Sequence, residues 1–360
     1  MRNETARLLP LVAGLGLLAT SAFAAECHWT SLPDPPHWTV SGAWTERGTV
    51  IFVDAAKSEL VEYSTTNGEL LNRTQTLGGL PKESFRPSGL QRSPTGFALV
   101  DADAKVEWLG DDFSVKRTLD LTDVKGLGQQ KITSAFEWLV AGNELLTFSD
   151  LEFPDGTTSS AFLKIPSTAP SRFSILSDLA IDDAGRDLYL FGHPYLAASS
   201  TNGYVLVMGP EPAIFEVPLS GSPKVRRLEV GKLLGKRPSL PKKQGIATVR
   251  ALYAAVGKSS MPVGLYFDRD RLYVLFRNPT DRGTEWLIYR LNPKSGSLES
   301  TMKLGSTAAH LAIVPGPNSW AILEKGEVLG LGQQSILGLL TVPSEVIRQS
   351  SDGRLCSSMR

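Results

Sequence analysis

The feature that most constrains the fold is a phrase that the sequence contains twice. Residues 179–194 read LAIDDAGRDLYLFGHP and residues 264–279 read GLYFDRDRLYVLFRNP. Each copy starts with apolar residues, passes through a polar turn with Asp and Arg, and continues into an apolar run with a tyrosine. Short apolar runs bounded by turn residues are typical of β-strands, so each copy predicts a strand, a turn and a second, stronger strand.

Four weaker relatives of this phrase occur elsewhere, at residues 42–54, 89–101, 135–150 and 310–326. The centres of the six stronger strands are separated by 47, 47, 43, 85 and 47 residues; they are Phe52, Leu99, Leu146, Tyr189, Val274 and Ala321. A period of about 40–50 residues made only of strands is typical of the blades of a β-propeller.

Two further strand-like runs follow the stronger strand, for example at 59–65 and 70–77 in the first repeat. Each repeat therefore has four strands. The sequence predicts an all-β fold, a six-bladed β-propeller of four-stranded blades, with seven blades as the alternative because the interval of 85 residues is long enough for two repeats.

In its period and strand order the chain resembles the six-bladed β-propellers of the NHL-repeat, TolB-like and gluconolactonase-like superfamily, over residues 40–345. The resemblance implies that the two chain ends meet in one blade. It also implies a binding site on the face that carries the loops between strands two and three and the connections between blades. Gluconolactonase-like propellers hold a catalytic metal there, but their motif is not matched residue by residue, so no residue role is transferred.

Residues 230–262 are expected to form an insertion between blades four and five, with a short helix within 244–258. The insertion has no Asp or Glu and is rich in basic residues, namely Lys232, Lys236, Arg237, Lys242, Lys243, Arg250 and Lys258. It is either a docking surface for an anionic ligand or an acidic protein, or a solvated loop. Long loops are also expected on blades three to five. Together, the insertion and these loops give the candidate binding residues Lys236, Arg237, Lys242, Lys243, His193, Arg277 and Asn278.

The ends of the stronger strands carry polar side chains that equivalent blades would bring together around the axis. They are Asp54, Asp101, Asp150, His193, Asn278 and Glu324. Oxygen ligands such as these suit Ca²⁺, so the acidic members Asp54, Asp101, Asp150 and Glu324 are a candidate calcium site. The other interpretation is that Asp and Asn stand there because they bond nearby backbone in turns.

Residues 1–24 predict a secretory signal peptide, with Arg2 and Arg7 before a short apolar stretch and Ala22-Phe23-Ala24 as the cleavage site. The mature chain, 25–360, is then one propeller domain that is periplasmic or secreted, without a transmembrane segment. Its two cysteines, Cys27 and Cys356, lie near its two ends. A disulfide between them is expected to close the ring in an oxidising compartment.

The balance of charge, 37 basic and 37 acidic residues, argues against nucleic acid as a partner. Motifs of zinc proteases, α/β-hydrolases and c-type haem proteins do not occur in the sequence. We therefore expect a binding or scaffolding module for a protein or a small anionic ligand, without a cofactor. The alternative is a Ca²⁺-dependent hydrolase or lactonase, and the sequence does not decide whether the chain is an enzyme.

Overall fold

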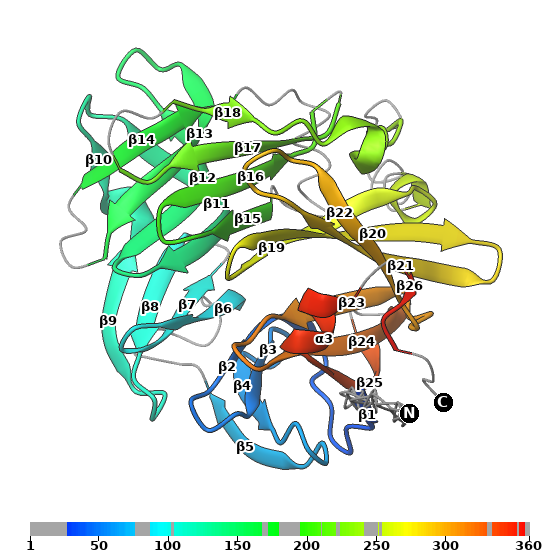
Figure 1. The fold of residues 1–360 in the computed structure, drawn as a ribbon. Helices are drawn as coiled ribbons and strands as arrows, with labels where there is room; N and C mark the ends of the chain where they lie inside the picture. The colour runs from blue at the N-terminus through cyan, green and yellow to red at the C-terminus, as the bar shows by residue number, and fades with distance from the viewer. Residues whose placement is uncertain are drawn as a thin grey trace, which may run out of the picture.

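The structure is a computed structural model of the chain. It describes residues 27–75, 87–101, 104–167, 172–179, 195–209, 211–220, 224–240, 251, 254–329, 333–350 and 353–356. Six sheets stand around a central axis, as Figure 1 shows, and each is one blade. The prediction of an all-β, six-bladed propeller is confirmed.

The blades follow one another along the chain. Blade one is β2 (Thr39–Trp44), β3 (Val50–Asp54), β4 (Glu59–Tyr63) and β5 (Leu70–Gln75). Blade two is β6 (Pro87–Ser93), β7 (Gly96–Asp101), β8 (Lys105–Leu109) and β9 (Val115–Asp120). Blade three is β11 (Lys131–Ala141), β12 (Glu144–Glu152), β13 (Thr158–Pro166) and β14 (Arg172–Asp178), closed on itself by β10 (Lys125–Gly126).

The remaining blades complete the ring. Blade four is β15 (Tyr195–Ala198), β16 (Asn202–Val207), β17 (Ala213–Pro218) and β18 (Arg226–Arg227). Blade five is β19 (Met261–Asp268), β20 (Arg271–Thr280), β21 (Gly283–Leu291) and β22 (Leu298–Leu304), extended by β26 (Gly353–Arg354). Blade six is β23 (His310–Val314), β24 (Ser319–Leu329), β25 (Gln333–Pro343) and β1 (His28–Thr30).

Helical structure is scarce among the residues that the structure describes. The 3₁₀ turns are η1 (Leu121–Asp123) and η2 (Gly231–Leu234), and α3 (Ser344–Gln349) follows blade six. Residues 251 and 254–257 are also helical, within the segment where a short helix was expected. No helix among the described residues has the length and the apolar character that a membrane crossing requires.

The core lies between the blades. All five residues of β3 (VIFVD) are buried, because one face of the strand packs on blade two and the other on blade six. Between blades five and six, the rings of Tyr273 and Trp320 meet edge to face with centroids 5.2 Å apart. A strand that is covered on both faces must be apolar at nearly every position, which explains the strong second strand of each repeat.

The innermost strands are β2, β6, β11, β15, β19 and β23, and side chains link several of them. The Ser41 hydroxyl of blade one lies 3.1 Å from the carbonyl of Leu90 in blade two and 2.5 Å from its N–H. The Gln91 amide of blade two donates to the carbonyl of Trp138 in blade three (3.0 Å). These bonds fix the relative height of neighbouring inner strands, and so the positions of the side chains that surround the axis.

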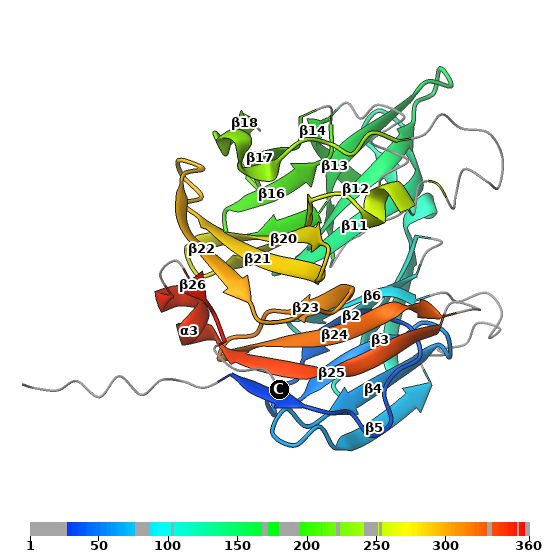
Figure 2. The ribbon, with the colours of Figure 1, turned by 90° about the vertical axis from the view of Figure 1, so that its right-hand side faces the viewer.

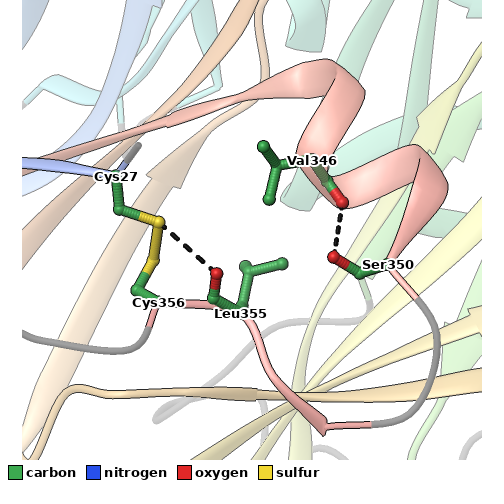
Figure 3. The surroundings of a disulfide bond; sticks show 5 residues. All are labelled: Cys27, Val346, Ser350, Leu355 and Cys356. Atoms are coloured by element: carbon green, nitrogen blue, oxygen red, sulfur yellow. Dashed lines mark hydrogen bonds between the residues drawn. A yellow bond between two sulfur atoms is a disulfide. The ribbon is translucent and has the colours of Figure 1, made fainter. Parts of the chain in front are cut away.

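The two chain ends meet at the seam between blades five and six. Strand β1 completes blade six by pairing with β25, Trp29 opposite Leu340, while β26 pairs with β22 of blade five. Figure 2 shows β1 along the edge of β25. The predicted disulfide is confirmed: Cys27 and Cys356 are bonded with their Cα atoms 5.8 Å apart, as Figure 3 shows.

The assignment of blade four was wrong. The repeat predicts its stronger strand around Tyr189. The four strands begin only at Tyr195, and 203–207 lie in the second strand, β16. Tyr189 and most of the repeated phrase at 179–194 lie outside the described residues. The apolar pattern alone misassigned the strands, because a buried strand at either place carries the same type of sequence.

The loop assignments need a related correction. The long loop expected between strands two and three of blade four corresponds to residues 192–203, but these residues include β15 and the turn to β16. In blades three and five the expected loops are mostly strand: β12 continues to Glu152 and β20 to Thr280. Blade six has an equally long pair, β24 and β25, which the sequence interpretation did not single out.

Candidate functional site

The candidate metal residues hold local structure in their own parts of the ring. The buried Asp54 carboxylate accepts hydrogen bonds from the backbone N–H groups of His37 (2.8 Å), Trp38 (3.1 Å) and Ala56 (3.2 Å). This is what the turn interpretation predicts for an aspartate at a strand end. Asp54 therefore has a structural role whether or not it also binds a cation.

Asp150 and Glu324 do not stand at the ends of their strands, as was expected, because β12 and β24 continue past them. Asp150 accepts from the hydroxyl of Ser160 (2.5 Å), and Glu324 accepts from the indole N–H of Trp29 (3.1 Å). Asp101 ends β7, but its side chain is not described, and His193 is outside the described residues. A search of the described side chains finds no group of three or more His, Cys, Asp or Glu that could hold a metal ion. Calcium binding stays a prediction.

The predicted basic docking residues are only partly described. Lys236 is exposed and Arg237 half-buried, whereas Lys242 and Lys243 lie outside the described residues. Asn278 accepts from the hydroxyl of Ser260 (2.5 Å) and donates to Glu285 (3.0 Å), which joins the end of the 230–262 segment to blade five. A docking role for this segment also stays a prediction.

Another set of polar side chains gathers around the propeller axis, and we call it the axial cluster. Four members lie on innermost strands and two on the strands next to them, all in blades three to six. They are Glu137, Tyr195, Tyr266, Arg277, His310 and Lys325. Glu137, Tyr195, Tyr266 and His310 keep part of their surface exposed. Arg277 and Lys325 are 7% and 8% exposed.

Arg277 is a buried cation with few partners. Its guanidinium donates to the carbonyl of Val256, in the helical part of the 230–262 segment, and its Nε has no hydrogen-bond partner. No described carboxylate pairs with it. Burial lowers the pKa of Arg277, although a guanidinium remains charged at any ordinary pH.

Lys325 and His310 are cross-strand neighbours in blade six, so their side chains project from the same face of the sheet. The Lys325 ammonium donates to the carbonyl of Thr39 in blade one (3.1 Å) and meets no described carboxylate. Burial lowers the pKa of Lys325 to about 8. Burial, together with the positive charges of Lys325 and Arg277, lowers the pKa of His310 to about 4, so its imidazole is neutral at pH 7.

Glu137, Tyr195 and Tyr266 form the uncharged side of the cluster. Burial raises the pKa of Glu137 to about 8, opposed by a hydrogen bond from the N–H of Trp138. Burial also raises the pKa of Tyr195, as do Tyr266 and Glu137, while the charge of Arg277 opposes this. Burial and Glu137 raise the pKa of Tyr266, whose ring packs edge to face on Trp320 at 5.6 Å.

At pH 7 the cluster therefore combines an arginine, a largely protonated lysine, a neutral imidazole, two phenols and a mostly protonated carboxyl group. Two buried cations for which the described residues provide no carboxylate partner are costly, unless an anion is supplied from outside. Clusters of perturbed ionisable groups are typical of functional sites. The arrangement suits the binding of a small anion that also accepts hydrogen bonds.

Sequence reasoning found Arg277 but missed the other five members. It looked for function in loops and at the ends of the stronger strands, whereas four of these five side chains lie elsewhere: Glu137 and Tyr266 within innermost strands, and Tyr195 and His310 at the start of innermost strands. A signal was present for one of them: Glu137 interrupts the apolar run AFEWLVA, and a charged residue in such a run is unusual.

No protein-family model matches the chain, and neither does the sequence of any curated protein. Similar solved structures include a protein assigned as a gluconolactonase (14% identity, covering 89% of this chain and 93% of that one, TM-score 0.49). A luciferin-regenerating enzyme is also similar (12%, 85% and 91%, TM-score 0.48), as is a streptogramin B lyase (10%, 87% and 96%, TM-score 0.44). At these values the likeness is one of fold and carries no argument about chemistry; the propeller itself rests on the six sheets described above.

Proposed function

We propose that this protein is an exported β-propeller that binds a small anionic ligand at the axial cluster. The observation that carries the proposal is the pair of buried cations, Arg277 and Lys325, for which the described residues supply no carboxylate partner. A bound anion would offset the cost of burying both charges. The segment 230–262 contributes through Val256, whose carbonyl orients the Arg277 guanidinium.

The proposal of export rests on the N-terminal segment and is compatible with the disulfide, since such bonds persist in oxidising compartments. Expression of the full chain in a Gram-negative host is expected to yield a mature protein that begins at Ala25 in the periplasm or the medium. A full-length protein in the cytoplasm would contradict export without bearing on anion binding.

The test of binding is a calorimetric titration of the mature protein with sulfate at constant ionic strength and pH 7. Sulfate is suitable because its charge does not change in this range. The Lys325→Met variant is expected to lose at least about tenfold in affinity, because one of two buried cations is removed. The matched control is Lys236→Met, which removes an exposed lysine and should leave the affinity unchanged. Equal affinities in all three proteins would overturn the proposal.

A further inference from the structure

The axial cluster has hydrogen-bonding groups that a simple anion would not use. The hydroxyl groups of Tyr195 and Tyr266 make no hydrogen bond to any residue that the structure describes. The ring nitrogens of His310 make none either, and within the same residues the Glu137 carboxyl group accepts only from the N–H of Trp138. All four residues keep part of their surface exposed, so these groups can bond water or a bound ligand.

The open groups lie beside the buried cations. Strand β11, which carries Glu137, is next to β15, which carries Tyr195, and β15 is next to β19, which carries Tyr266. Tyr195 connects the two groups, since both Glu137 and Arg277 are near enough to its phenol to affect its pKa. The cluster therefore has a cationic end, in blades five and six, and a neutral, hydrogen-bonding end, in blades three to five.

We infer that the ligand is a hydroxy acid, whose carboxylate lies at Arg277 and Lys325 and whose hydroxyl groups bond the phenols and the carboxyl group of Glu137. The inference rests on the proposed function. Phenol and carboxyl groups each donate and accept hydrogen bonds, as aliphatic hydroxyl groups do, so the two sets are complementary. A carboxylate without hydroxyl groups would leave the phenols and the carboxyl group to water, or unpaired.

A site built to bond a hydroxyl group discriminates strongly against an analogue that lacks it, because its own polar groups are then left unpaired. Two pairs of probes isolate this effect. Tartrate and succinate share charge and carbon chain and differ by two hydroxyl groups. Gluconate and hexanoate form a longer pair with a single carboxylate. Sulfate serves as the anion without a carbon chain.

The experiment is calorimetric titration of the disulfide-bonded mature protein with each probe at pH 7. In at least one pair the hydroxylated member is expected to bind about tenfold more tightly or better. The double variant Tyr195→Phe/Tyr266→Phe should remove most of that preference and leave the affinity for sulfate unchanged. Tyr289→Phe, which changes a tyrosine outside the cluster, should keep the preference.

The outcomes separate the two claims. Equal binding within both pairs, together with measurable binding of sulfate, overturns the hydroxy-acid inference and leaves the proposed function standing. A preference that persists in the double variant also overturns it. If neither sulfate nor any carboxylate binds, the proposed function fails and the inference fails with it. Because wild-type protein alone supplies the first and third results, a variant that folds poorly does not block the test.

Discussion

Lys325 shows what the axial cluster costs the protein. Its ammonium is buried and, among the described residues, bonded only to the carbonyl of Thr39, and burial lowers its pKa from 10.5 to about 8. Replacing an uncompensated buried charge with an apolar side chain of similar size is often stabilising. A residue that weakens the fold and is still present is best explained by a function.

Lys325→Met is therefore expected to raise the free energy of unfolding at pH 7 by about 1–3 kcal/mol. The gain should be largest below pH 8, where the lysine is charged in both the folded and the unfolded chain. It should shrink towards pH 10.5, where both states lose the charge. Urea denaturation at pH 7 and at pH 10 measures this. A loss of stability at pH 7 would mean that the lysine contributes to the fold.

Asp54 gives the opposite case, a buried carboxylate that is well paired, by three backbone N–H groups and by the ring of His37 (3.2 Å). Asp54→Ala leaves three N–H groups without their acceptor and is expected to cost about 2–4 kcal/mol of stability. If the role is structural, the loss is the same in EDTA and in millimolar Ca²⁺. A stabilisation of the wild type by Ca²⁺ that Asp54→Ala abolishes would favour the calcium-dependent alternative. Thermal denaturation under both conditions distinguishes them.

At the scale of single residues the sequence predicted some features and not others. The bond between Cys27 and Cys356 was predictable, because two cysteines near the ends of a chain that is expected to be exported have few other uses. Arg277 was found because it lies near the end of a repeated phrase, where a loop was expected. Glu137 and Tyr195 could not be placed together, since 58 residues separate them in the sequence and only the pairing of their strands brings them to one axis.

Among the elements, β1 carries the closure of the ring. It is only three residues long, and its pairing with β25 joins the first described residues to the last complete blade. The disulfide holds Cys27, just before β1, to Cys356, just after β26, and so ties the seam from both sides. Short strands bind weakly by themselves, so the covalent link is what makes this pairing permanent.

The double variant Cys27→Ser/Cys356→Ser is expected to lose about 2–5 kcal/mol of stability, since the bond closes a loop of 329 residues. Hydrogen exchange should show faster opening of β1 and of the edge of β25 than of β3 in blade one. Uniform acceleration over all six blades would contradict a local role. Anion binding should survive in the folded variant, since Arg277 and Lys325 are hydrogen-bonded to Val256 and Thr39 and not to the disulfide.

The repeated hydrophobic pattern of the sequence predicted most of the strands but not all of them. A period near 47 residues identified six repeats because strands two to four of a blade are close in sequence. It failed in blade four, where the strands lie C-terminal to the repeated phrase. Hydrophobic pattern reports burial and not pairing, and only pairing decides which of two apolar runs joins a sheet.

For the molecule as a whole, the cluster predicts a pH dependence of anion binding. Below pH 8 Lys325 is charged and Glu137 neutral, and above it Lys325 loses its charge while Glu137 becomes negative. Both changes disfavour an anion. Arg277 stays charged, His310 is already neutral, and Tyr195 and Tyr266 keep their protons because their pKa values are raised.

The affinity for sulfate is therefore expected to fall at least about tenfold between pH 7 and pH 10. Titrations at constant ionic strength measure the profile. In Lys325→Met the remaining fall should come from Glu137 alone and be shallower. An affinity that rises with pH, or a profile that the variant leaves unchanged, would show that the anion binds elsewhere.

The most direct test of the central claim is to locate an anion in a crystal of the mature protein. Selenate is a suitable probe, because its shape and charge resemble those of sulfate and its selenium gives an anomalous signal. The account predicts a selenium peak at the propeller axis, with selenate oxygens within hydrogen-bond distance of the Arg277 guanidinium and the Lys325 ammonium. Peaks confined to exposed basic side chains such as Lys236, with none at the axis, would contradict it.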